Sequence, residues 1–259
     1  MEMVVSADGT PIAVWQSGQG PPLVLVHGTV ADHGRWSPVL AQFGERRTVL
    51  AVDRRGRGAS GDADDYSLDQ EVADVVAVVE GAGGDVSLLG HSYGGVCALE
   101  AALQTDRVGK LVLYEPPLGF VRSSDELRLQ LDELLAEERR DEVVALFMRE
   151  VAGASAEQVE LLRSLPAWEA RRAAAHTIPR EDRASGEYVF DADRFESLRV
   201  PTLFLVGGDS SDAFRAAASA AEAALPNCQV VVLEGQRHAA MDTATDLFVR
   251  EVLRFLDSN

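Results

Sequence analysis

A serine set between two glycines is the part of the sequence that most clearly suggests chemistry. Residues 90–94 read Gly-His-Ser-Tyr-Gly, the G-x-S-x-G spacing of a nucleophile elbow, in which a strand turns sharply into a helix. Glycine at the outer positions removes side chains that would collide in so tight a turn. Ser92 is therefore a candidate nucleophile, held at a helix N-terminus whose N–H groups point toward developing negative charge.

A serine nucleophile needs a base, and the base needs a carboxylate that orients it. His238 and Asp209 are the candidates for these roles, because each lies just after an apolar run near the end of the chain. Two other histidines compete for the role of base. His91 directly precedes Ser92, so its side chain is expected to point away from it, and His27 is expected to be structural.

Short apolar runs typical of buried strands position these residues. Asp8-Gly9 indicates a hairpin between residues 3–6 and 11–16, and six further runs cover residues 23–26, 48–52, 86–89, 110–114, 200–206 and 229–233. Helical patterns alternate with them, over residues 35–43, 67–81, 96–103, 213–225 and 248–256. This alternation predicts a mostly parallel sheet of eight strands flanked by helices, with the candidate residues at its carboxyl edge.

The segment 118–199 breaks this rhythm with amphipathic helical patterns and no comparable strand. Four helices are expected in it, beginning near Ser124, Asp141, Ser155 and Pro166. The sequence thus predicts a core domain of residues 1–117 and 200–259, interrupted by an all-helical cap over 118–199. The large apolar side chains of the cap are expected to form its own interior; they are Phe120, Phe147, Met148 and Trp168.

The composition limits the classes of partner. With 24 basic and 42 acidic residues the formal charge is −18, which argues against nucleic acid and against anionic membrane surfaces. No apolar stretch approaches the roughly 20 residues of a membrane span, and no secretory signal is recognisable. Two cysteines, Cys97 and Cys228, make no disulfide framework. These features predict a reduced, cytoplasmic protein that acts on a small molecule, as a monomer or homodimer.

Residues 53–60, Asp-Arg-Arg-Gly-Arg-Gly-Ala-Ser, follow a buried strand and form a tight loop rich in charge. The structural interpretation is favoured here, with Asp53 paired to the nearby arginines and taking no part in chemistry. The five histidines, at positions 27, 33, 91, 176 and 238, show no spacing typical of metal ligands. No metal or cofactor is therefore expected.

Along essentially its whole length, the chain resembles the α/β-hydrolase fold superfamily. The resemblance rests on His27-Gly28-Thr29, the 53–60 loop, the 90–95 elbow and the chain order Ser92, Asp209, His238. It implies that Ser92 is the nucleophile, His238 the base and Asp209 the orienting acid. It also implies an oxyanion hole formed by the backbone N–H groups of Thr29 and Tyr93.

The sequence offers more than one candidate for the acid. Asp212 lies three residues further along the same loop, and Glu115 follows the sixth strand, where a minority of relatives carry the acid. These two residues remain alternatives to Asp209 at the level of sequence, because the geometry that a triad requires cannot be seen there.

Serine at the elbow implies acyl transfer through an acyl-enzyme, most simply hydrolysis of an ester, thioester or lactone. A helical cap implies a small to medium, largely apolar substrate, and Trp36 and Met241 are possible substrate-lining residues. Other reactions on the same fold remain open: carbon–carbon bond hydrolysis, cofactor-free perhydrolysis, or a lyase or cyclase step. A ligand-binding receptor or scaffold is a further alternative.

Overall fold

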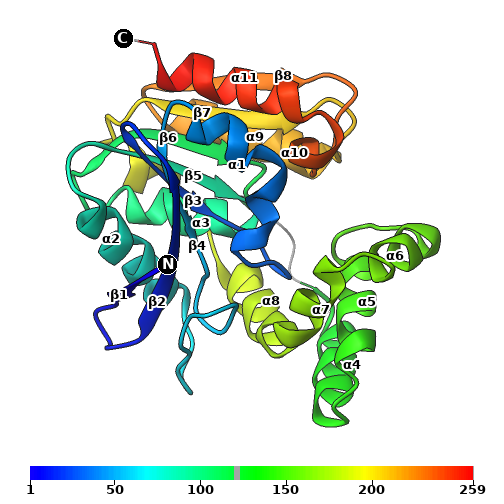
Figure 1. The fold of residues 1–259 in the computed structure, drawn as a ribbon. Coiled ribbons are helices and arrows are strands. Elements are labelled where there is room, and N and C mark those ends of the chain that lie inside the picture. The colour runs from blue at the N-terminus through cyan, green and yellow to red at the C-terminus, as the bar shows by residue number, and fades with distance from the viewer. Residues whose placement is uncertain (120–122, 259) are drawn as a thin grey trace.

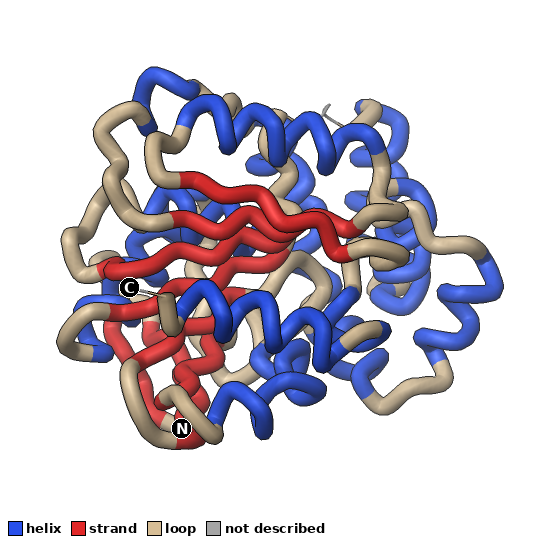
Figure 2. Tube along the Cα trace, turned by 90° about the horizontal axis from the view of Figure 1, so that it is seen from above, coloured by secondary structure: helices blue, strands red, loops and turns tan. Residues whose placement is uncertain are grey.

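The computed structural model describes residues 1–119 and 123–258, so Phe120 lies outside the described residues. A single eight-stranded sheet crosses the molecule (Figures 1 and 2) in the order β1-β2-β4-β3-β5-β6-β7-β8. Only the pairs β1–β2 and β2–β4 are antiparallel. The strands are β1 (Glu2–Val5), β2 (Pro11–Gly18), β3 (Pro22–Val26), β4 (Thr48–Val52), β5 (Val86–His91), β6 (Val108–Tyr114), β7 (Thr202–Gly207) and β8 (Cys228–Leu233). The predicted sheet is confirmed.

Helices cover both faces of the sheet, as Figure 2 shows. The helices α2 (Leu68–Ala82), α3 (Tyr93–Ala101) and α9 (Asp212–Ala224) pack on one face. The other face carries α1 (Ser37–Gly44) and α11 (Thr245–Leu256), together with η1 (His33–Trp36) and α10 (Ala240–Thr243). Strand β3 is apolar throughout because helices cover both of its faces. Val24 and Val26 pack toward α2, α3 and α9, and Leu23 and Leu25 pack toward α1 and α11.

A helical insertion leaves the sheet after β6 and returns at β7, as expected (Figure 1). It contains α4 (Asp125–Ala136), α5 (Arg140–Glu150), α6 (Ala156–Arg163), α7 (Ala167–Ala173), η2 (Ala175–Thr177), α8 (Ile178–Glu187) and η3 (Ala192–Phe195). The fourth expected helix, which was to begin near Pro166, is α7 and ends at Ala173. A separate helix, α8, follows it, with Pro179 in its first turn, where proline is well tolerated.

The insertion has its own hydrophobic cluster, as the sequence predicts. Phe147 and Trp168 are buried in it, and Met148 packs against it half-buried. Val30, from the loop after β3, joins this cluster and is only 3% exposed. Val30 thus anchors the cap to the core, and it does so from the loop that is predicted to form the oxyanion hole.

Serine side chains begin several of these helices as the sequence suggested. Ser67 caps α2, Ser124 caps α4 and Ser155 caps α6, each accepting a backbone N–H three residues further on. In α6 the full capping box is present, because the Gln158 side chain accepts the N–H of Ser155 in return.

Candidate active site

The elbow has the strained geometry expected of a nucleophile. Ser92 lies between β5 and α3 with φ 55° and ψ −130°, in the left-handed half of conformational space that residues other than glycine rarely adopt. Its N–H donates to the carbonyl oxygen of Tyr114 at 2.9 Å. Glycine is required nearby, because a Cβ on Gly94 would lie 2.3 Å from the carbonyl oxygen of His27 and one on Gly90 would lie 2.4 Å from that of Gly94.

His238 lies in the loop after β8, and its ring is fixed from several directions. Nδ1 is 2.6 Å from Oε2 of Glu115. The ring is stacked on Phe214 at 4.7 Å between centroids and lies 4.5 Å from the ring of His91. Because the carboxylate accepts the proton on Nδ1, the neutral ring leaves Nε2 free to act as a base. The side chain as a whole is 35% exposed.

The structure corrects the preferred partner of His238: it is Glu115, not Asp209. Glu115 is fully buried at the end of β6, and its second oxygen, Oε1, accepts the N–H of Gly207 at 2.8 Å. The Asp209 side chain is exposed. Its backbone N–H donates to the carbonyl oxygen of Gln236 at 2.9 Å, which ties the turn after β7 to the turn after β8.

Backbone geometry explains why Glu115, and not Asp209, pairs with His238. Glu115 has φ 46°, one of four positive values outside glycine among the described residues. Such strain is typical of functional sites, because the surrounding structure must maintain it. Strand β6 lies between β5 and β7, so a side chain that leaves its end can reach across to the histidine loop. Asp212, the other alternative, is 96% exposed and pairs with Arg215.

The loop after β3 packs directly against the nucleophile. A Cβ on Gly28 would lie 2.7 Å from the Cβ of Ser92. Val30, two residues later, has φ 59°, a rare value for a β-branched residue. Within the described parts of the chain, the N–H groups of Thr29 and Tyr93 donate to no other residue. Both groups therefore stay candidates for the predicted oxyanion hole.

His27 is structural, as the sequence analysis expected. It is fully buried, with Nδ1 2.8 Å from the carbonyl oxygen of Gly28, and Nε2 accepts the backbone N–H of Arg54 at 3.2 Å. Burial, with the positive charges of Arg54 and Arg57, lowers the pKa of His27 well below its ordinary value. Both ring nitrogens are engaged in these hydrogen bonds, so His27 has no free lone pair to take the proton of Ser92.

His91 also fails as a base. Its Nε2–H donates to the backbone oxygen of His238 at 2.9 Å, and the residue is buried. Burial, then the nearby His238 and Arg35, lower the pKa of His91 well below its ordinary value. His91 therefore remains neutral, and its hydrogen bond to the backbone of His238 supports the loop after β8.

The charged loop after β4 differs from its expected arrangement. Asp53 has no arginine partner among the described residues and accepts instead from Trp15 Nε1–H at 2.9 Å, from the N–H of His33 at 2.8 Å and from the N–H of Ala59 at 3.0 Å. Asp53, His33 and Asp32 place their ligand atoms within 4.8 Å of one another. The carboxylate of Asp53 is already occupied by donors, so this cluster is structural.

The arginines of the same loop form a buried ionic network. Arg54 bonds Glu71 through Nε at 3.0 Å and Nη2 at 2.6 Å, and its Nη2 also bonds Glu181. Arg57 Nη2 lies 2.6 Å from Oε1 of Glu181. Burial acts to lower the pKa of Arg54, but the carboxylates of Glu181 and Glu71 outweigh it and hold that pKa well above its ordinary value.

This network connects the cap to the loop after β3, a link that sequence reasoning missed. Glu181 belongs to the cap helix α8. Arg54 Nη1–H donates to the carbonyl oxygen of His27 at 3.3 Å, and the Arg54 guanidinium lies 4.9 Å from the centroid of the Tyr93 ring. The charge on α8 therefore helps to hold both segments that carry the candidate oxyanion donors.

The two possible substrate-lining residues are core residues instead. Trp36 and Met241 have no exposed surface and belong to the cluster between the sheet and α1 and α11. Trp36 meets the ring of His91 edge-on at 6.4 Å, and Met241 Sδ accepts from Arg35 Nη2 at 2.7 Å. Neither side chain therefore presents a surface to a substrate in this structure.

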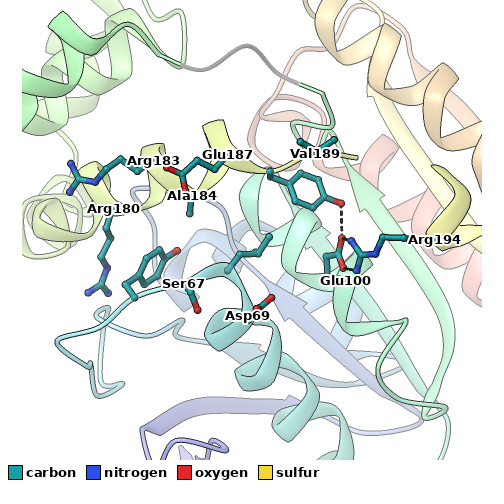
Figure 3. Close-up of a pocket in the computed structure, with 12 residues that line it drawn as sticks. Ser67, Asp69, Glu100, Arg180, Arg183, Ala184, Glu187, Val189 and Arg194 are labelled. Atoms are coloured by element: carbon teal, nitrogen blue, oxygen red, sulfur yellow. Dashed lines mark hydrogen bonds and ion pairs between the residues drawn. The ribbon is translucent and has the colours of Figure 1, made fainter. Parts of the chain in front are cut away.

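A groove of about 530 Å³ lies between α2, the end of α3 and α8 (Figure 3), and neither Ser92 nor His238 lines it. Its charges are largely paired: Glu100 accepts from Tyr188 Oη at 2.8 Å and from Arg194 at 2.7 Å, and Arg180 lies 2.7 Å from Asp62. The groove is best explained as a charged seam between the cap and the core.

Comparison with known proteins defines the class of the molecule. The family model described as "Alpha/beta hydrolase family" matches residues 23–251. The chain belongs to this family. A solved structure of an alpha/beta hydrolase from Sphaerobacter thermophilus is 34% identical, with a TM-score of 0.88, and the match covers 98% of this chain and 100% of that one.

Several curated relatives are esterases. Pimeloyl-[acyl-carrier protein] methyl ester esterase from Nitrosomonas europaea is 38% identical over 115 residues, 44% of each chain. The enzyme of that name from Xanthomonas campestris is 26% identical over 92% of this chain and 96% of its own. The protein is therefore an α/β hydrolase similar to esterases.

Two further observations concern the cysteines and the search for membrane-spanning helices. Cys97 and Cys228 are both free. Among the described residues, none of the helices combines the length and the apolar character needed to cross a bilayer.

Proposed function

We propose that the protein is a serine hydrolase that cleaves an ester bond through an acyl-enzyme on Ser92. The observation that carries this proposal is the pair formed by buried Glu115 and His238 at the same sheet edge as the strained Ser92. Similarity to esterases supports an ester over the other acyl compounds. Thioesters and lactones belong to the same chemistry, because the same acyl-enzyme serves all three.

In the proposed mechanism Ser92 Oγ attacks the carbonyl carbon, and His238 Nε2 takes the hydroxyl proton. The Glu115 carboxylate stabilises the imidazolium that forms. The N–H groups of Thr29 and Tyr93 bind the oxyanion, and a donor of this kind contributes about 3–4 kcal/mol. The imidazolium then protonates the departing alcohol. Finally, His238 activates a water that releases the acid from Ser92.

A panel of p-nitrophenyl esters, acetate through octanoate, tests this proposal. We expect turnover by the unmodified protein and a fall of at least about 10⁴-fold in kcat for Ser92→Ala, because no other group can form the acyl-enzyme. Ser197→Ala, at an exposed position in the same chain, is the matched control and should keep its activity. Turnover that survives Ser92→Ala would contradict the acyl-enzyme and favour a lyase or cyclase.

A further inference from the structure

A phenylalanine outside the proposed triad lies directly against the candidate base. The ring of Phe214 stacks on the imidazole of His238, with 4.7 Å between the centroids and 18° between the ring planes. The imidazole also lies 4.5 Å from the ring of His91, which is inclined to it by 41°. Phe214 belongs to α9, a helix that carries none of the proposed catalytic residues, so its place beside the histidine needs an explanation.

The sequence of α9 explains how this ring reaches the edge of the sheet. Phe214 is the only large apolar side chain among residues 212–224, where the other apolar positions are alanines. Its spacing from the buried alanines places it on the face of the helix that packs on the core; these are Ala217, Ala218 and Ala221. The small alanines let α9 lie close to β7 and β8 (Figure 1), while Phe214, in the first helical turn, extends toward the loop after β8.

Backbone hydrogen bonds hold both sides of this stack in place. The turn before α9 is tied to the turn after β8, because the N–H of Asp209 donates to the carbonyl oxygen of Gln236 at 2.9 Å. The main chain on both sides of the histidine is also fixed. Tyr114 Oη donates to the carbonyl oxygen of Arg237 and accepts the N–H of Ala240 at 3.0 Å. The remaining freedom of the histidine is the rotation of its side chain.

One hydrogen bond does not fix the plane of an imidazole. Nδ1 of His238 is 2.6 Å from Oε2 of Glu115, but a rotation about this bond would still move Nε2 at the opposite edge of the ring. A stacked ring opposes that rotation, because tilting the imidazole would lose the dispersion contact across its face. A phenyl face also attracts a cation, so it favours the imidazolium that forms in the transition state.

We propose that Phe214 is a positioning residue for His238, which keeps Nε2 in the orientation that proton transfer from Ser92 requires. Phe214 acts on the reaction through the histidine, by means of the stacked contact. The inference rests on the proposed function for its effect on turnover. The orientation of the imidazole, however, is a property of the protein that can be measured without a substrate.

Kinetics on the p-nitrophenyl esters test the effect on catalysis. We expect Phe214→Leu, which stays apolar but has no aromatic face, to lower kcat by about 10-fold and to leave KM within about twofold, because the stack acts in the transition state. Phe214→Tyr keeps the ring and should recover most of the lost kcat. Phe190→Leu is the matched control, because Phe190 is also half-buried against the same core cluster but stacks on Phe195. It should keep its kcat.

Proton NMR tests the positioning itself and needs no turnover. The proton that Nδ1 of His238 donates to Glu115 should give a signal downfield of the amide protons, identified by its loss in His238→Gln. We expect this signal to be sharp in the unmodified protein and in Phe214→Tyr, and to be broadened or lost in Phe214→Leu. The pair of His33 Nδ1 and Asp53 Oδ1, 2.7 Å apart, is an internal reference and should be the same in every variant.

The two measurements separate this inference from the proposed function. If no variant cleaves an ester, the proposed function fails, and the NMR signal alone decides whether Phe214 positions His238. A signal that is missing from the unmodified protein, or equally sharp in Phe214→Leu, would overturn the inference. A kcat for Phe214→Tyr or Phe190→Leu as low as that of Phe214→Leu would overturn it too, because the loss would then reflect a general disturbance of packing.

Discussion

Glu115→Gln should lower kcat for ester hydrolysis by about 10⁴-fold, whereas Asp209→Asn should leave it close to the unmodified value. The glutamine is nearly isosteric, and its oxygen can still accept from Gly207. Its amide cannot replace the carboxylate that receives the Nδ1 proton of His238 and stabilises the imidazolium, so the wrong tautomer is favoured. Steady-state kinetics on the p-nitrophenyl esters measure both variants.

The two substitutions form an internal control for one another. Asp209 is exposed and Glu115 is fully buried, so a fold defect in Glu115→Gln must be excluded by circular dichroism and thermal unfolding. An equal loss of kcat in the two variants, or a loss confined to Asp209→Asn, would show that Glu115 is not the one carboxylate that orients His238 during catalysis. That outcome would contradict the assignment made from the structure.

Glu181→Gln should destabilise the fold by about 3–5 kcal/mol, because breaking a buried ionic network leaves uncompensated charge behind. Arg54 and Arg57 would then share a single carboxylate, that of Glu71, at positions with almost no solvent exposure. Urea unfolding followed by tryptophan fluorescence and by circular dichroism measures the loss. Glu187→Gln is the matched control, since it lies on the same helix α8 but is exposed.

The same variant has a consequence for catalysis. Arg54 contacts the carbonyl oxygen of His27 and the ring of Tyr93, so its displacement should disturb both oxyanion donors. We expect kcat to fall in Glu181→Gln under conditions where the protein is still fully folded. A stability and a kcat that both match those of Glu187→Gln would contradict a role for this network in holding the cap to the site.

The sheet and the elbow could be predicted from the sequence because their signals are local. A strand buried on both faces must be apolar at every position, as residues 23–26 are. The turn at 90–94 needs glycine because a Cβ on Gly94 would lie 2.3 Å from a backbone oxygen of the neighbouring loop. His238 follows the last parallel strand, as the sequence shows, and its role as the base stays a prediction.

The partner of His238 could not be chosen from the sequence for a physical reason. Asp209 and Glu115 both follow buried strands, and only the backbone conformation decides which carboxylate turns inward. The positive φ of Glu115 leaves no local signal. The bond between Arg54 and Glu181, 127 residues apart, is likewise invisible without the fold. Trp36 and Met241 were misjudged because proximity in sequence to a catalytic loop does not distinguish a packed face from an exposed one.

The most direct test of the central claim is covalent labelling with a fluorophosphonate, followed by intact mass and peptide mapping. The account predicts one adduct per chain, located on Ser92, which forms rapidly in the unmodified protein and much more slowly in His238→Ala and Glu115→Gln. No adduct, or an adduct on another residue, would contradict the claim that Ser92 is a nucleophile activated by the His238–Glu115 pair.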